Sequence, residues 1–297
     1  MLRYDELSRL SRLIYEGQEI TYHYDKGGHL TEKRFLNGII TNYQYNSMGL
    51  LSCLTHKADG NILERYHYEY DLAGNKTEII KQREIPLLSK HLTEEMCKNL
   101  KEENGVYSYR YDKLDRLIEV YKGTERLRNY NYDAFGNRIK KQEAMVINFY
   151  KYNAANQLLE ARGSEEERYQ YDRRGNLTGI MKGGELDTGY LYDATNHLSR
   201  AINEKGEIAI YNYCGLGYRF GKQEYIIERT SDWWERGKEA KYEYEAPHAQ
   251  LDYLLDLTKP YHNLLSKSET TEQGSNTQDY VWDSNVVSML EEKASYI

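Results

Sequence analysis

Residues 130–138 read Tyr130-Asn131-Tyr132-Asp133-Ala134-Phe135-Gly136-Asn137-Arg138, and this phrase decides the fold. Tyr130 and Tyr132 are two residues apart, so in a β-strand their side chains lie on the same face. Asp133 follows the strand, and Gly136 with Asn137 supplies a turn that needs a positive φ angle. A tyrosine-rich strand that runs through an acidic residue into a glycine turn is one half of a β-hairpin.

The phrase recurs about ten times. Counted from the second tyrosine of each copy, the gaps are 20, 21, 25, 41, 21, 20, 19, 21 and 21 residues, so the period is near 21 and one interval holds an insertion. Asp or Asn follows this tyrosine in nine of the ten copies, and Cys214 is the exception. The second tyrosines are Tyr4, Tyr24, Tyr45, Tyr70, Tyr111, Tyr132, Tyr152, Tyr171, Tyr192 and Tyr213.

Each copy also has a turn slot three residues after the Asp or Asn. Glycine fills it in six copies, and Ser8, Asp115, Asn156 and Asn196 fill it in the others. Asn and Asp tolerate the left-handed region best among non-glycine residues, so the slot predicts a positive φ. We expect a structural role in the turns for the motif residues Tyr24, Asp25, Gly28, Tyr70, Asp71, Gly74, Tyr111, Asp112, Tyr132, Asp133, Gly136, Tyr171, Asp172, Gly175, Tyr192 and Asp193.

The segments between the turns predict half-buried strands. In residues 41–45 and 107–111 tyrosine alternates with polar residues, which is typical of an antiparallel strand with one dry and one wet face. Ten hairpins give roughly twenty strands, and an open twisted sheet rarely exceeds about ten strands without curling. The sequence therefore predicts an all-β fold in which repetitive antiparallel β-hairpins form a curled, spiralling β-shell wall.

The chain divides near residue 230. Residues 1–230 hold the repeats, with an insertion at about 81–105 in which Thr93 to Asn104 predicts one short helix. In residues 231–297 the period decays, and we expect tail hairpins. There we predict a turn at residues 231–237, an alternating strand at 241–245 and a mobile polar loop at 267–278.

Composition limits the classes of function. The formal net charge of −7 leaves no basic stripe for phosphates, which argues against a nucleic-acid partner. No window of 18 apolar residues encodes a membrane span, and the first residues have no signal-peptide apolar region. The chain begins inside a repeat, so we interpret it as a fragment. Cys53, Cys97 and Cys214 are scattered and predict no disulfide framework.

The motif residues do not form a recognisable catalytic pattern. Each repeated Asp precedes a turn, where Asx side chains bond the backbone, so turn formation is the better interpretation than paired carboxylates. The 8 histidines show no metal spacing, and we expect no catalytic residue, cofactor or metal. Trp233 and Trp234 could bind carbohydrate by stacking, although packing between strands explains two aromatic residues more simply.

The phrase Tyr169-Gln170-Tyr171-Asp172-Arg173-Arg174-Gly175-Asn176-Leu177 resembles the YD repeat of RHS proteins. The resemblance covers about residues 1–230, and residues 256–261 and 280–283 look like the stretch ahead of the RHS-associated core. It implies a β-shell on a secreted or cell-surface protein. In bacterial relatives this shell encloses a C-terminal polymorphic toxin, and in teneurins it is an extracellular adhesion module.

The sequence departs from the family pattern at its end. Relatives commonly carry an Asp-Pro motif in the core, whereas this sequence has no Asp-Pro pair. We expect a chain truncated before the core and any C-terminal toxin domain. The first hypothesis is a non-enzymatic scaffold whose partners are the remaining repeats or core, with toxin as cargo. The second is a module that binds glycans or a partner protein, and the third, less favoured, is an enzyme or toxin in its own right.

Overall fold

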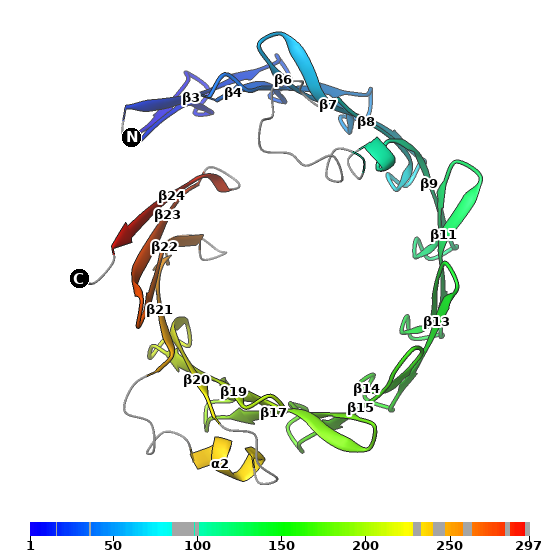
Figure 1. Cartoon of the computed structure of the whole chain (residues 1–297). Helices are drawn as coiled ribbons and strands as arrows, with labels where there is room; N and C mark the ends of the chain where they lie inside the picture. Colours follow the sequence, from blue (N-terminus) through cyan, green and yellow to red (C-terminus); the bar gives the residue numbers. More distant parts are fainter. Residues whose placement is uncertain are drawn as a thin grey trace. The chain divides into compact units, whose positions relative to one another are not determined.

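The computed structural model describes residues 1–15, 17–35, 37–84, 98, 101–227, 233–239, 247–257, 263–282 and 286–294. The chain forms two compact units, Met1–Ile147 and Asn148–Ile297, and each is described by itself. In both units the strands are antiparallel and each pairs with the next strand of the unit along the chain (Figure 1).

The first unit is built from β1 to β12. Its strands are β1 (Leu2–Tyr4), β2 (Leu10–Tyr15), β3 (Gln18–Tyr24), β4 (Leu30–Arg34), β5 (Ile40–Tyr45), β6 (Leu51–Ala58), β7 (Asn61–Tyr70), β8 (Lys76–Arg83), β9 (Gly105–Tyr111), β10 (Leu117–Lys122), β11 (Glu125–Tyr132) and β12 (Arg138–Glu143).

The second unit contains the remaining strands and one helix. They are β13 (Val146–Tyr152), which begins at the division, β14 (Leu158–Arg162), β15 (Glu166–Tyr171), β16 (Leu177–Lys182), β17 (Glu185–Tyr192), β18 (Leu198–Asn203), β19 (Glu207–Tyr213), β20 (Arg219–Ile226), α2 (Trp233–Glu239), β21 (Ala249–Asp256), β22 (Asn263–Thr271), β23 (Gly274–Trp282) and β24 (Val286–Ala294).

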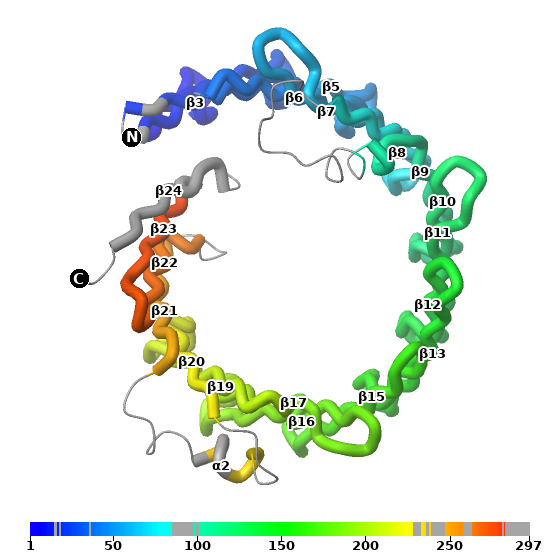
Figure 2. Tube along the Cα trace, viewed as in Figure 1, coloured from blue at the N-terminus to red at the C-terminus, as the bar shows by residue number. Residues whose placement is uncertain are grey.

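These elements confirm the predicted fold class. The first 226 residues hold twenty strands, as ten hairpins require. Figure 2 follows the Cα trace of each unit along a curved path, so the sheet curls within a unit. The positive φ predicted for the turn slot is present at its non-glycine residues, with values of 59° at Ser8, 57° at Asp115, 58° at Asn156 and 71° at Asn196.

A β-bulge accompanies the second tyrosine of the motif. Tyr132 pairs with Arg138 while Asn131 pairs with Lys140, so Ile139 is left as the extra residue. The same shift occurs beside Tyr24, Tyr171 and Tyr213. A bulge bends its strand and increases the local twist, so a bulge in every repeat contributes to the curvature of the sheet.

The residues that the structure describes form no thick core. The described buried apolar residues are spread along the strands, and their clearest cluster is Ile202, Ile208 and Ile227 in the second unit. Trp233 and Trp234 of α2 pack against this cluster.

The helix α2 also identifies the two faces of the second unit. The ring of Trp234 lies against Gly189, which strand alternation places on the face opposite Tyr190. In Figure 1, α2 lies on the convex side of the arc that the strands of this unit follow. The face that carries Tyr190, here called the tyrosine face, is therefore the concave one.

Two predictions for the tail are wrong. Of the predicted turn at residues 231–237, the described residues 233–237 are instead the start of α2, where Glu235 in the first turn suits the positive end of the helix. The predicted loop at residues 267–278 is the hairpin of β22 and β23, in which Ser268 pairs with Thr277. Polar Ser and Thr residues are frequent in loops, but β-branched Thr also favours strands.

Other expectations fall mainly outside the described residues. Of the helix predicted from Thr93 to Asn104, the structure describes only residue 98 and residues 101–104, and Lys98, Lys101 and Glu102 are helical. The strand predicted at residues 241–245 lies outside the described part. The domain boundary near residue 230 stays a prediction.

Replacing Gly189 by alanine tests the packing of α2. A methyl group there would lie 2.1 Å from Cζ3 of Trp234, so the ring and its helix must shift. Overpacking of this kind typically costs about 1–3 kcal/mol. We expect Gly189→Ala to lower the thermal midpoint and to move the tryptophan fluorescence maximum to longer wavelength. Gly215→Ala is the matched control, because nothing lies within 4 Å of a methyl group there. An unchanged emission spectrum in a folded Gly189→Ala protein would contradict the described packing.

Candidate functional site

The repeated Asp closes the turn of its own repeat. In the copy at Asp133, Oδ1 accepts hydrogen bonds from the backbone N–H groups of Phe135 and Asn137, at 2.9 and 2.8 Å. Oδ2 accepts a third bond, from Nδ2 of Asn137 at 2.9 Å. The carbonyl oxygen of Asp133 also accepts from the N–H of Gly136, which has φ 89°. Both oxygens of the carboxylate thus accept hydrogen bonds from the turn.

Other copies repeat this arrangement with small changes. Asn46 and Asn153 keep the two backbone bonds to Oδ1. In the copies at Asp5 and Asp112 the third donor is an arginine, Arg9 or Arg116. Asn203 forms the same turn between β18 and β19, accepting from Lys205 and Glu207, although it lies outside the motif.

The second motif tyrosine joins neighbouring repeats. The hydroxyl of Tyr132 donates to the carbonyl oxygen of Leu117 at 2.8 Å. Leu117 lies six residues after Tyr111, the corresponding tyrosine of the preceding repeat. The same bond is made by Tyr24, Tyr45, Tyr70, Tyr111, Tyr171 and Tyr192, at 2.7–3.1 Å.

The residue four positions after the Asp makes a second link between repeats, which the sequence did not predict. Arg116 binds Asp112 in its own turn and donates to the carbonyl oxygen of Asp133 in the next turn, at 3.1 Å. Its guanidinium carbon also lies 4.9 Å from the ring centroid of Tyr132. Arg9 makes the corresponding bond to the carbonyl oxygen of Asp25, at 3.2 Å. The residue at this position differs between copies, so the sequence shows no common pattern for the link.

The electrostatics of the turns fit this structural use. The side chain of Asn137 and then its backbone N–H hold the pKa of Asp133 below its ordinary value. Hydrogen bonds within the turn likewise lower the pKa of Asp5, Asp25, Asp71, Asp112, Asp172 and Asp193. Burial raises the pKa of motif tyrosines, Tyr132 and Tyr171 among them. These shifts keep the aspartates ionised and the tyrosines neutral.

Within the described ranges, no group of three or more His, Cys, Asp or Glu side chains could hold a metal ion. The part of the chain that the structure describes also contains no helix long and apolar enough to span a membrane.

Trp233 and Trp234 lie in α2 rather than in a turn. Both are half-buried, and their rings meet edge to face with centroids 6.0 Å apart. Trp234 contacts Gly189, and Nζ of Lys238 lies 4.8 Å from its ring centroid. The packing interpretation accounts for these contacts, and they leave less of the ring surface open for a sugar to stack on.

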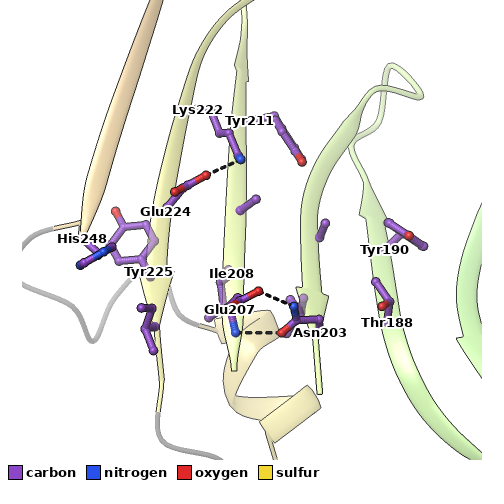
Figure 3. Close-up of a pocket in the computed structure, with 14 residues that line it drawn as sticks. Thr188, Tyr190, Asn203, Glu207, Ile208, Tyr211, Lys222, Glu224, Tyr225 and His248 are labelled. Carbon is purple, nitrogen blue, oxygen red and sulfur yellow. Dashed lines mark hydrogen bonds and ion pairs between the residues drawn. The ribbon is translucent and has the colours of Figure 1, made fainter. Parts of the chain in front are cut away.

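A hollow of about 530 Å³ opens on the tyrosine face of β17 to β20 (Figure 3). Its floor is made by Ala201 and Ala209, which are register partners. Tyr190 lies beside Ala201, and Glu224 lies beside Ala209. It is also lined by Tyr211, Lys222, Asn203 and Glu207, and no sequence motif predicted a site at this place.

Removing one tyrosine hydroxyl tests the link between repeats. Tyr132→Phe deletes the bond to Leu117 and should cost about 0.5–1.5 kcal/mol in the free energy of unfolding, the usual contribution of such a bond. Tyr109→Phe is the control, since its hydroxyl has no hydrogen-bond partner among the described residues. Chemical denaturation measures both, and equal losses in the two variants would refute the assigned role.

The Asp133 carboxylate should make the fold sensitive to acid. Its pKa is lowered from 3.8 in the folded chain, so it stabilises the fold above that unfolded value. This stabilisation is lost as the pH falls through the lowered folded pKa. Asp133→Asn keeps the acceptor oxygen, as Asn46 does, but it has no carboxylate to protonate. Between pH 6 and pH 3, which is about one unit below the ordinary carboxyl pKa, this variant should therefore lose less stability than the parent.

Asp133→Ala removes the acceptor and should lower the thermal midpoint at every pH. Thermal unfolding followed by circular dichroism measures all three proteins. An alanine variant as stable as the asparagine variant would show that the turn does not depend on this side chain.

Comparisons with known proteins identify the repeat. Residues 88–230 match the family model described as the teneurin YD-shell. The chain is 30% identical over 163 residues to tRNA nuclease WapA of Bacillus subtilis (strain 168), a match that covers 51% of this chain and 6% of that protein. It is 32% identical over 120 residues to tRNA3(Ser)-specific nuclease WapA of Bacillus spizizenii, covering 38% of this chain and 5% of that protein.

Among solved structures, a chain of the Photorhabdus luminescens Tc holotoxin pore aligns with 98% of this chain and 21% of its own length, at 13% identity and a TM-score of 0.39. The chain thus spans a small part of each relative. The family match over residues 88–230, nearly half of the chain, and the tyrosine–aspartate period that continues on both sides of it support an RHS/YD-repeat protein.

Proposed function

We propose that this chain is a structural section of the shell of a larger RHS/YD-repeat protein and that it has no catalytic role. The observation that supports this best is the use of the repeated carboxylates. At Asp71, Asp133 and Asp172 both oxygens accept hydrogen bonds from the same turn. A general base or nucleophile needs an oxygen directed at its substrate, whereas here Oδ1 accepts from backbone N–H groups and Oδ2 from the side-chain amide of the turn asparagine.

The shell section would help to enclose a C-terminal toxin domain, as the resemblance to bacterial RHS proteins implies. Two relatives are named as tRNA nucleases, but the matches cover only 6% and 5% of their lengths. Those names describe whole proteins of which the matched region is a small share. By the same resemblance, the parent protein would be secreted or on the cell surface, and its partners would be further shell repeats or the core.

A glycan-binding role at Trp233 and Trp234 is the alternative, and the geometry favours it less. Trp234 already contacts Gly189 and Lys238, and both tryptophans pack against the isoleucine cluster. A glycan array on the parent protein and on Trp233→Ala would test it directly. A signal that the variant loses would restore the alternative.

The scaffold proposal predicts an inert chain within a larger functional protein. Purified chain incubated with total tRNA should leave the tRNA intact, and expression in bacterial cells should not arrest growth. Cleavage or arrest would overturn the proposal. Mass spectrometry of the native protein, captured by an antibody against residues 101–227, should find further YD repeats and a separate C-terminal domain in the same complex. Recovery of this chain alone would also count against it.

A further inference from the structure

The hollow on β17 to β20 exists because two small residues meet there. The residue nine after each second motif tyrosine pairs across the sheet with the residue four before the next one. At this place most repeats put one or two large side chains on the tyrosine face. The described register partners are Leu13–Ile20, Lys33–Thr41, Leu54–Tyr66, Ile79–Tyr107, Val120–Arg128, Ala161–Glu167, Ile180–Thr188 and Ala201–Ala209.

Of these described pairs, only Ala201–Ala209 consists of two alanines. Every other pair contains at least one side chain of threonine size or larger. The neighbouring repeats therefore serve as internal references for a filled wall. Compared with those repeats, this one lacks large side chains at the pair, which leaves the hollow. Tyr190 and Glu224 border the hollow, because they are the next register partners of Ala201 and Ala209.

The charges around the hollow favour a cation. Two carboxylates, Glu207 and Glu224, line it together with one ammonium group, Lys222. Lys222 pairs with Oε1 of Glu224, and Nδ2 of Asn203 donates to Oε2 of Glu207 at 2.6 Å, as the dashed lines of Figure 3 show. Each carboxylate keeps one oxygen without a partner among the described residues. Among the residues that line the hollow, one negative charge thus remains in excess.

The rings around the hollow point to the same chemistry. Elsewhere in the wall, cationic groups lie over tyrosine rings, as Arg9 does over Tyr24 at 4.7 Å. On the rim of the hollow, Tyr211 already has Arg219 at 5.2 Å. By contrast, no cationic side chain of the described residues lies over the ring of Tyr190. A guanidinium group suits this place better than an ammonium group, because it is planar, stacks on aromatic rings and donates to carboxylates in a fork.

We propose that the hollow binds an arginine side chain of a polypeptide segment, whose guanidinium stacks on Tyr190 and pairs with the carboxylates of Glu207 and Glu224. The alanine floor admits the side chain, and the surrounding wall supplies the groups that recognise it. The site lies on the concave face of its unit, where a scaffold would meet an enclosed polypeptide.

The test uses an acetylated and amidated Gly-Gly-Arg-Gly-Gly peptide, with the same peptide carrying neutral citrulline as its comparison. Titration followed by saturation-transfer NMR should show saturable binding of the arginine peptide, with a dissociation constant of about 1 mM as expected for one side chain. The citrulline peptide should bind at least about tenfold more weakly, because it lacks the charge.

Ala201→Leu fills the hollow with a residue that the wall already holds at Leu54, and it should weaken binding at least about tenfold. Ala161→Leu is the matched control at the corresponding position of another repeat, and it should leave binding unchanged. Glu224→Gln keeps the shape of the hollow but removes a charge, so it decides the outcome should Ala201→Leu fail to fold.

Three results would overturn the proposal. They are equal binding of the two peptides, binding that Ala201→Leu and Glu224→Gln leave intact, and no saturable binding up to about 10 mM. Competition by a neutral oligosaccharide at this site, with no effect of peptide charge, would assign it to glycans instead. None of these results depends on the tRNA and growth assays that test the scaffold role.

Discussion

The bond from a tyrosine hydroxyl to the carbonyl oxygen of the preceding repeat is the interaction on which this structure depends. A sheet only one layer thick buries few residues completely, so it lacks the packed interior that holds most domains together. Tyr132 and its counterparts compensate for the missing interior, because each packs a half-buried ring and donates a hydrogen bond from its hydroxyl to the neighbouring hairpin. Tyrosine fits because phenylalanine would pack without the link, and a shorter polar residue would make neither contact. The abundance of tyrosine in the sequence thus follows from the thinness of the wall.

Features fixed within one repeat could be predicted from the sequence. The positive φ of Asn156 depends on its own turn, and the alternation in residues 107–111 gives the strand and its faces. Features that depend on pairing between strands could not be predicted from the sequence. The bulge at Ile139 appears only when Tyr132 is set opposite Arg138. The hollow likewise required the register that places Ala201 beside Ala209. In the tail, where no period helps, local composition misjudged both α2 and the strand β22.

The motif aspartates show how a repeated acidic residue can serve the turns of a fold. An acid that recurs at one register invites a catalytic explanation, but at Asp133 every oxygen is used to close the turn. What varies between repeats is more informative about recognition. The turn residues change little, whereas the register pair that begins nine residues after the second tyrosine changes from Leu54–Tyr66 to Ala201–Ala209. A repeat protein of this kind can keep its architecture and place a distinct surface in a single repeat.

The pairing of each strand with the next one has a consequence for how the chain folds. The contacts in such a ladder mainly join successive strands, so the loops to be closed are short and the contact order is low for an all-β protein. Hairpins can form one after another in the order of synthesis, each using the exposed edge of the one before as its template. A disruptive mutation in one repeat then stops the sequential strand pairing at that repeat and leaves the repeats that were synthesised earlier intact.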